Sequence, residues 1–169
     1  MRDEDWETPE DVRDLWRAEY LLVCALRAMA FGHGDCPAVR QAFVGACGEA
    51  ADQTLMSYFV VVQYIGMTGR RRLALHAPGC VRLSPDERSM ITLVAAAQES
   101  LRLSVDAGLR IALGDLVEGE PREGLVQAVL MVARTLQDNG HRLPLRLSAL
   151  SPPQSSADSS SAETLATWH

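Results

Sequence analysis

Hydrophobic residues recur along most of this chain at the three- and four-residue spacing of an amphipathic helix. The first such set begins at Val12 and contains one polar exception, Glu19. It is preceded by Thr8 and Pro9, which favour the N-cap and the first position of a helix. The pattern therefore predicts a helix over residues 9–31, ending at a glycine-rich turn.

The same spacing predicts further helices downstream, over residues 36–50, 51–66, 85–101, 106–117 and 121–139. Asp35 is placed to cap the second of these. The clearest start is Ser84-Pro85-Asp86-Glu87, where serine is an N-cap, proline the first helical residue and Glu87 the partner in a capping box. Residues 67–83 instead alternate at Leu73, Leu75 and Val81, which predicts an extended connector.

Together these elements predict an all-α, single-domain bundle of about six helices with one extended connector. Hydrophobic residues make up 47% of the chain and aromatic residues only 5%, so the core must be aliphatic. We expect an acidic N-terminal extension over residues 1–8 and a helical domain over residues 9–143. The serine- and proline-rich residues 144–169 lack the apolar content of a core and are predicted to be a disordered tail.

The net charge and the types of basic residue argue against several classes of partner and reaction. The net charge is −6, and most of it lies in residues 1–19, which carry eight acidic residues and three arginines. An acidic chain without a basic stripe argues against nucleic acid and against an anionic membrane surface as partners. All sixteen basic residues are arginine. A chain without lysine cannot form a Schiff base or supply a P-loop lysine.

The apolar stretches are too short to predict a transmembrane helix. The longest are residues 20–31, which contain Arg27, and residues 55–67, whereas a spanning helix takes roughly 20 residues. The first residues are charged and do not resemble a signal peptide. Four irregularly spaced cysteines are typical of reduced thiols rather than a disulfide framework. We therefore expect a cytoplasmic protein.

Two short His/Cys pairs are candidates for metal binding: His33 with Cys36, and His76 with Cys80. Each pair lies in a turn and has the ligand spacing with which one turn can aim two side chains at a zinc ion. The leading interpretation is nevertheless two ordinary turns, because cysteine often packs as a small hydrophobe. Zinc binding by these four residues is the alternative.

Two further groups of residues are candidates for chemistry. Cys36, near the start of a predicted helix and close to His33, is a candidate reactive thiol for a cysteine-dependent enzyme or redox protein. Arg70, Arg71 and Arg72 are candidates for anion binding, although a solvated corner is the simpler interpretation. No hydrolase, dinucleotide, metalloprotease or EF-hand motif is present, so the sequence favours a protein without catalytic activity.

The segments CALRAMA, GDC, GRRRLALHAPGCVRLSPDE and LVAAAQ, in this order within residues 20–140, resemble a group of short, uncharacterised all-helical bacterial proteins. That group has no assigned activity, so the resemblance implies a compact helical domain and no residue roles.

The leading functional hypothesis is a small helical binding or regulatory protein of the adaptor type. Its expected partner is another protein or a second copy of the chain. We expect excess apolar surface on the third and sixth helices, the latter at Met131 and Val132 beside its core stripe.

Overall fold

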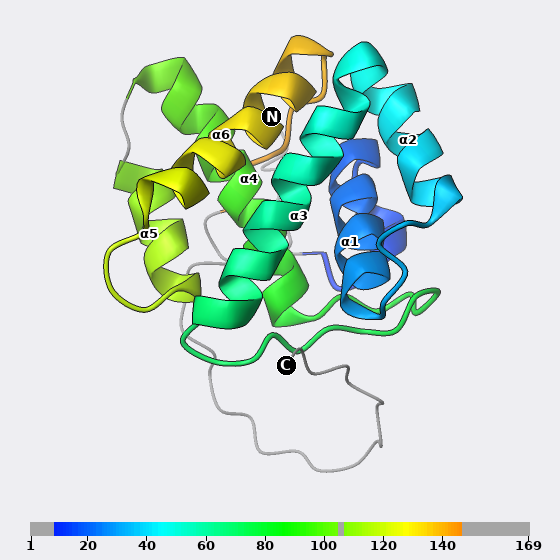
Figure 1. Cartoon of the computed structure of the whole chain (residues 1–169), viewed down its shortest axis with the longest axis horizontal. Helices are drawn as coiled ribbons and strands as arrows, with labels where there is room; N and C mark the ends of the chain where they lie inside the picture. The colour runs from blue at the N-terminus through cyan, green and yellow to red at the C-terminus, as the bar shows by residue number, and fades with distance from the viewer. Residues whose placement is uncertain (1–8, 105–106, 147–169) are drawn as a thin grey trace, which may run out of the picture.

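The computed structural model describes residues 9–104 and 107–146, and the regular structure within them is helical (Figure 1). The α-helices in chain order are α1 (Arg17–Ala30), α2 (Pro37–Cys47), α3 (Ala51–Thr68), α4 (Pro85–Leu103), α5 (Ala107–Leu116) and α6 (Glu123–Asp138). Single-turn 3₁₀ helices, Val12–Asp14 and Gly48–Ala50, precede α1 and α3. The described residues contain no β-strand. The predicted all-α class is confirmed.

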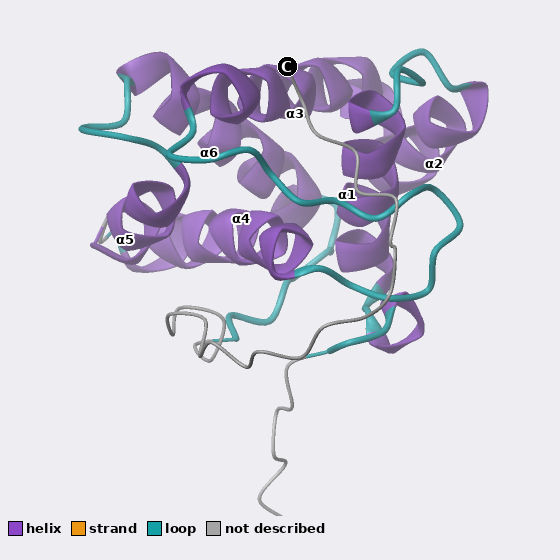
Figure 2. Ribbon diagram, turned by 90° about the horizontal axis from the view of Figure 1, so that it is seen from below, coloured by secondary structure: helices purple, strands orange, loops and turns teal. Residues whose placement is uncertain are grey.

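Helix α4 lies at the centre of the packing. It packs against α1, α5 and α6, whereas α3 packs against α2 and α6. Figure 1 shows α3 in front of α4, and the view turned by 90° in Figure 2 places α4 beside α5 on the opposite side of the molecule from α3. The core is aliphatic as expected from the composition, and its buried aromatic side chains are Phe43 and Tyr58.

Helix α4 begins as its sequence predicts. Ser84 is the N-cap, and its hydroxyl accepts a hydrogen bond from the Glu87 N–H at 3.1 Å. In return, the Ser84 N–H donates to Glu87 Oε2 at 2.8 Å. Both partners of this capping box are local in sequence, so the sequence was sufficient to place the start of the helix.

The predicted helix over residues 9–31 is wrong at its N-terminal end. The Val12 N–H donates to the Val81 carbonyl at 2.7 Å, and the Leu83 N–H donates to the Glu10 carbonyl at 2.8 Å. These backbone groups are satisfied by the connector, so this part of the chain does not need helical hydrogen bonds. Tertiary pairing here overrides the helix-start preference of the proline.

Helix α1 begins instead at Arg17. The preceding Trp16 has extended backbone angles, and its N–H donates to Glu19 Oε2 at 2.7 Å. Glu19, the polar exception in the apolar pattern, is fully buried at this helix start. Its carboxylate satisfies one of the free amide groups at the helix N-terminus.

The start of α2 also differs from the prediction. Cys36, not Asp35, occupies the N-cap position, and no side chain caps this helix. The Cys36 N–H donates to the His33 carbonyl at 3.0 Å, which closes a turn just before the helix. Pro37 then takes the first helical position, where the missing N–H costs little.

Helix α6 begins two residues later than predicted and ends as predicted. Arg122 is its N-cap and Glu123 its first residue, so the expected start at Pro121 is wrong. Gly140, just beyond the C-cap Asn139, has a φ of 82°, which glycine adopts without strain.

The connector between α3 and α4 runs along the foot of the bundle and turns back beside α1 (Figure 1). Leu73 and Leu75 are buried, as their alternation predicts. Val81, the third residue of this alternation, is 45% exposed.

The predicted acidic extension, residues 1–8, and most of the predicted tail lie outside the described residues. Residues 144–146, which the prediction assigns to the tail, contact the helical domain. Leu145 packs against the core, and Arg146 Nη2 donates to Glu19 Oε2 at 3.2 Å. Within the described ranges, no helix has both the length and the apolar character needed to cross a bilayer.

Candidate functional site

A cavity of about 780 Å³ lies between α1, the start of α2 and the connector. Most of the surface that lines it is apolar. A second cavity, of about 300 Å³, adjoins it between α1 and α2, and the two share Arg17, Tyr20, Cys24 and Val39. Figure 1 shows α1 and α2 side by side, with the connector turning back beside α1. We call these two spaces together the α1–α2 cavity.

Among the residues that the structure describes, every charged one that lines the α1–α2 cavity is an arginine, although the chain carries a net charge of −6. Arg13 is paired with Asp11, with 2.5 Å between Nη2 and Oδ2, and Arg27 is paired with Glu87. Arg17 has no hydrogen-bond or ion-pair partner among the residues that the structure describes. Two of the three lining cations are therefore neutralised, and Arg17 is not.

The Arg27–Glu87 pair joins α1 to α4 and is buried. Arg27 Nε donates to Glu87 Oε1 at 2.7 Å and Nη2 donates to Oε2 at 2.9 Å. The guanidinium also donates to the carbonyls of Cys80 and Arg82, and the His76 N–H donates to Glu87 Oε1 at 3.1 Å. These hydrogen bonds attach the connector to both helices and so position one wall of the cavity.

Three of the four cysteines line the larger cavity: Cys24, Cys36 and Cys80. All are free and partly exposed, whereas Cys47 is buried, and burial raises the pKa of its thiol. A hydrogen bond to Cys24 raises the pKa of the Tyr20 phenol above its ordinary value. The cavity wall therefore combines apolar surface with soft sulfur atoms and a phenol.

The predicted zinc set is not assembled. His33, Cys36 and Cys80 line the larger cavity, but His76 does not and is only 8% exposed. Among the described residues, no three His, Cys, Asp or Glu side chains are placed to hold a metal ion. The backbone hydrogen bond from His76 to Glu87 keeps that part of the connector in the interior, whereas Cys80 lies beyond the following turn.

The candidate thiol Cys36 lies at the N-cap of α2, in the same cavity wall as His33. Within the described part of the chain, neither side chain has a hydrogen-bond partner. A nucleophile activated by a base needs the two groups within hydrogen-bond reach. The structure therefore does not form the Cys–His pair that the sequence suggested.

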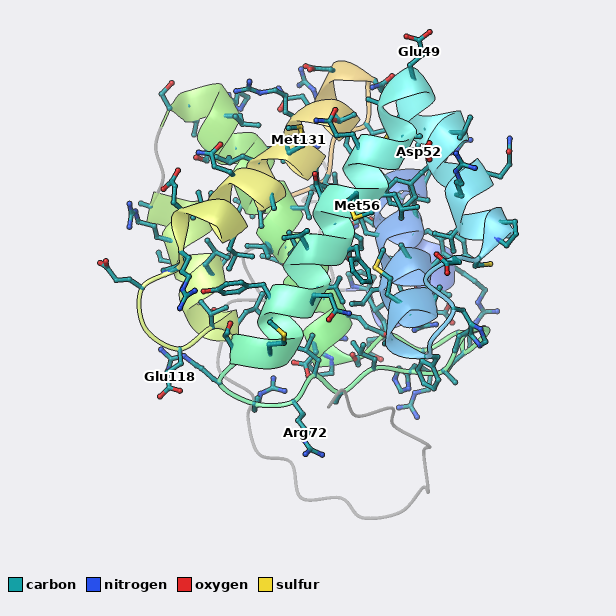
Figure 3. The ribbon with its side chains drawn as sticks, viewed as in Figure 1. Glu49, Asp52, Met56, Arg72, Glu118 and Met131 are labelled. Atoms are coloured by element: carbon teal, nitrogen blue, oxygen red, sulfur yellow. The ribbon has the colours of Figure 1, made fainter. Side chains whose placement is uncertain are left out.

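The three arginines proposed as an anion site point to different partners. Arg70 Nε donates to the Val117 carbonyl at 3.1 Å. Arg71 forms a bidentate pair with Asp86, and this hydrogen bonding raises the pKa of the Arg71 guanidinium. Arg72 extends away from the bundle (Figure 3). Two of the three guanidinium groups thus form hydrogen bonds within the protein, and the three groups do not converge on one anion.

The wall shared by the two parts of the cavity, at Arg17, Tyr20 and Cys24, was not predicted from the sequence. These residues lie at i, i+3 and i+7 on α1, so they occupy one helical face beside the core stripe. The feature of the sequence that could have indicated this wall is the presence of Tyr20 and Cys24 outside the core stripe. It does not identify a cavity by itself, because the opposing walls come from distant segments.

The chain matches no protein-family model, no curated protein and no solved structure. The resemblance to short helical bacterial proteins therefore stays a prediction.

Proposed function

We propose that this chain is a non-catalytic binding protein that takes a small, mostly apolar molecule into the α1–α2 cavity. The observation that carries this proposal is the cavity itself, with a volume of about 780 Å³ and a mainly apolar lining. Small-molecule sites in proteins typically enclose about 300–1,000 Å³ and are lined by apolar residues with a few polar groups.

A neutral solvatochromic dye, Nile red, tests the proposal. We expect its fluorescence to rise and shift to the blue on binding the wild-type protein. Cys24→Trp should weaken this binding, because Cys24 lines both parts of the cavity and the indole would occupy the space where they adjoin. Met67→Trp is the matched control, since Met67 is 74% exposed on α3 and lines neither part.

Circular dichroism would establish that both variants are folded. Equal dye binding by Cys24→Trp and Met67→Trp would show that the dye binds elsewhere and would contradict the proposal. So would the absence of any fluorescence change with the wild-type protein.

The second candidate function is self-association, the homodimer of the sequence-based hypothesis. Its support is a row of exposed apolar side chains on α3: Met56, Phe59, Val60 and Met67. Met131 of α6 is 38% exposed, and Figure 3 shows it facing the same side as Met56. Val132, expected to add to this surface, is fully buried instead. Of these two helices, α3 therefore exposes more large apolar side chains than α6.

Sedimentation equilibrium would test self-association. We expect a mass that increases with concentration in the micromolar range and falls to the monomer in Val60→Glu, because a buried unpaired carboxylate destabilises an interface. Ile111→Glu, at a similarly exposed apolar residue of α5, should leave the association unchanged. A wild-type protein that stays monomeric throughout this range would exclude the homodimer.

We further propose a cytoplasmic location and no nucleic-acid or membrane partner. The free state of all four cysteines supports the location, because reduced thiols are typical of that compartment. The net charge of −6 supports the absence of a polyanionic partner.

A further inference from the structure

The α1–α2 cavity has a charge opposite to that of the whole chain. No aspartate or glutamate is among the described residues that line it, whereas three arginines and two histidines, His33 and His141, are. Local charge of one sign in a mainly apolar cleft favours a ligand of the other sign. The ligand expected from this lining is therefore an anion.

Arg17 is the cation available to such a ligand. It is exposed, it lines both parts of the cavity, and no described residue neutralises it. Arg13 and Arg27, by contrast, already have carboxylate partners. A guanidinium without a carboxylate partner can form two parallel hydrogen bonds to an incoming carboxylate.

The side chain of Arg17 reaches across from α1 to α2. Its Nη2 lies 3.6 Å from the point that a Cβ atom of residue 45 would occupy. Residue 45 is a glycine, so it has no side chain that could cover the guanidinium. The group therefore remains accessible at the junction of the two parts of the cavity.

The remainder of the lining determines the rest of the ligand. The surface around Tyr20, Cys24 and Val39 is largely apolar, and a second charge placed there would lose its hydration without a partner. A flexible aliphatic chain would fit both parts of the cavity. A ligand with one charged end and one apolar body satisfies both features.

We infer that the α1–α2 cavity binds an aliphatic monocarboxylate. Its carboxylate pairs with the Arg17 guanidinium, and its chain lies between α1, α2 and the connector. This inference rests on the proposed function, because it specifies the ligand of the same cavity.

Isothermal titration calorimetry with octanoate and with octan-1-ol, two ligands of equal chain length, tests the inference. We expect the wild-type protein to bind octanoate at least about tenfold more tightly, as charge-assisted hydrogen bonds to carboxylates imply. Arg17→Gln should remove this preference, because it should weaken the binding of octanoate much more than that of octan-1-ol. Arg17→Lys should retain part of the preference, because lysine keeps the positive charge but cannot form the two parallel hydrogen bonds of a guanidinium.

Arg134→Gln is the matched control, since Arg134 is exposed on α6 and lines neither part of the cavity. Equal affinities for the two ligands, or a preference that survives in Arg17→Gln, would overturn the inference and leave the proposed function standing. If neither ligand binds, while circular dichroism shows folded protein, the inference is overturned, and the Nile red titration decides separately whether the proposed cavity function stands.

Discussion

At the scale of single residues, the Arg27–Glu87 pair is the feature that local sequence explains least. The two residues are 60 positions apart, and their side chains are 5% and 0% exposed. Removing two charges from water is costly, and their attraction offsets this cost only when the remaining donors and acceptors are also satisfied. Here backbone groups of the connector supply those partners. The pair therefore makes folding depend on correct placement of the connector.

Replacing Arg27 by methionine should lower the free energy of unfolding by about 3–5 kcal/mol, because it leaves the Glu87 carboxylate buried without its counter-ion. Urea denaturation followed by circular dichroism measures this loss. The matched control is Arg102→Met, which breaks the exposed pair with Glu99. The control should change stability little. Similar losses in the two variants would contradict this account of the buried pair.

Asp11 carries a prediction about pH. Hydrogen bonds from the side chain and the backbone N–H of Arg13 lower its pKa from 3.8 to about 2. The ionised carboxylate thus favours the folded state above pH 3.8, and this contribution is lost as the pH falls through about 2. Carboxyl carbon chemical shifts from NMR should give a midpoint near pH 2 for Asp11.

Arg13→Gln should raise the Asp11 midpoint towards 3.8, because it replaces the charged guanidinium donor with a shorter, neutral amide. Arg122→Gln, a remote exposed arginine at the start of α6, should leave it unchanged. A wild-type midpoint near 3.8 would show that the Asp11–Arg13 pair does not persist in solution.

At the scale of elements, the start of α4 combines a local cap with a tertiary contact. The Ser84 hydroxyl accepts from the Glu87 N–H and donates to the Ala74 carbonyl at 2.7 Å. Next to it, Asp86 Oδ2 accepts from the Ala74 N–H at 2.6 Å. The first turn of α4 therefore attaches the connector as well as starting the helix.

Ser84→Ala should lower the free energy of unfolding by about 1–2 kcal/mol, near the upper part of the range for N-cap serines, because both hydrogen bonds are lost. Thermal and urea denaturation would measure it. Ser89→Ala is a fair comparison, since the Ser89 hydroxyl makes an exposed hydrogen bond to the Pro85 carbonyl within the same helix. Its effect should stay within about 0.5 kcal/mol. Equal losses of unfolding free energy in Ser84→Ala and Ser89→Ala would show that the N-cap contributes no more than an exposed serine.

The two helix starts show where prediction from sequence succeeded and where it could not. Ser84 and Glu87 satisfy each other three residues apart, so periodicity and capping chemistry were enough to place α4. The start of α1 depends on Val12 donating to Val81, a partner 69 positions away that a local pattern does not contain. Glu19 and Arg27 stood out in the sequence as polar residues in apolar stretches, but their partners were not evident.

At the scale of the whole molecule, α4 contributes more buried residues than any other described helix. Its buried residues occur on every turn and include polar side chains such as Thr92, Gln98 and Ser100. Gln98 donates to the carbonyls of Ala133 and His141, which links α4 to α6 and to the segment that follows it. α2, by comparison, buries one face only.

Native-state hydrogen exchange should therefore protect the amides of α4 most strongly, with opening free energies close to that of global unfolding. The amides of α2 should exchange through smaller, local openings, because that helix lies at the edge of the bundle and has no side-chain cap. Equal protection of α2 and α4 would indicate that the whole bundle opens as a single unit.

The sequence by itself determined the helical class, the aliphatic core and the start of α4, because each follows from residues within a few positions of one another. Tertiary structure alone decided the start of α1, the burial of Arg27 with Glu87 and the failure of His76 to join His33, Cys36 and Cys80. It also decided the α1–α2 cavity. That cavity exists only where α1, α2 and the connector meet, and the charge at Arg17 stays unpaired only because no acidic side chain of the described fold reaches it. Such features depend on the packing of distant segments, and local patterns of hydrophobic and polar residues do not specify that packing.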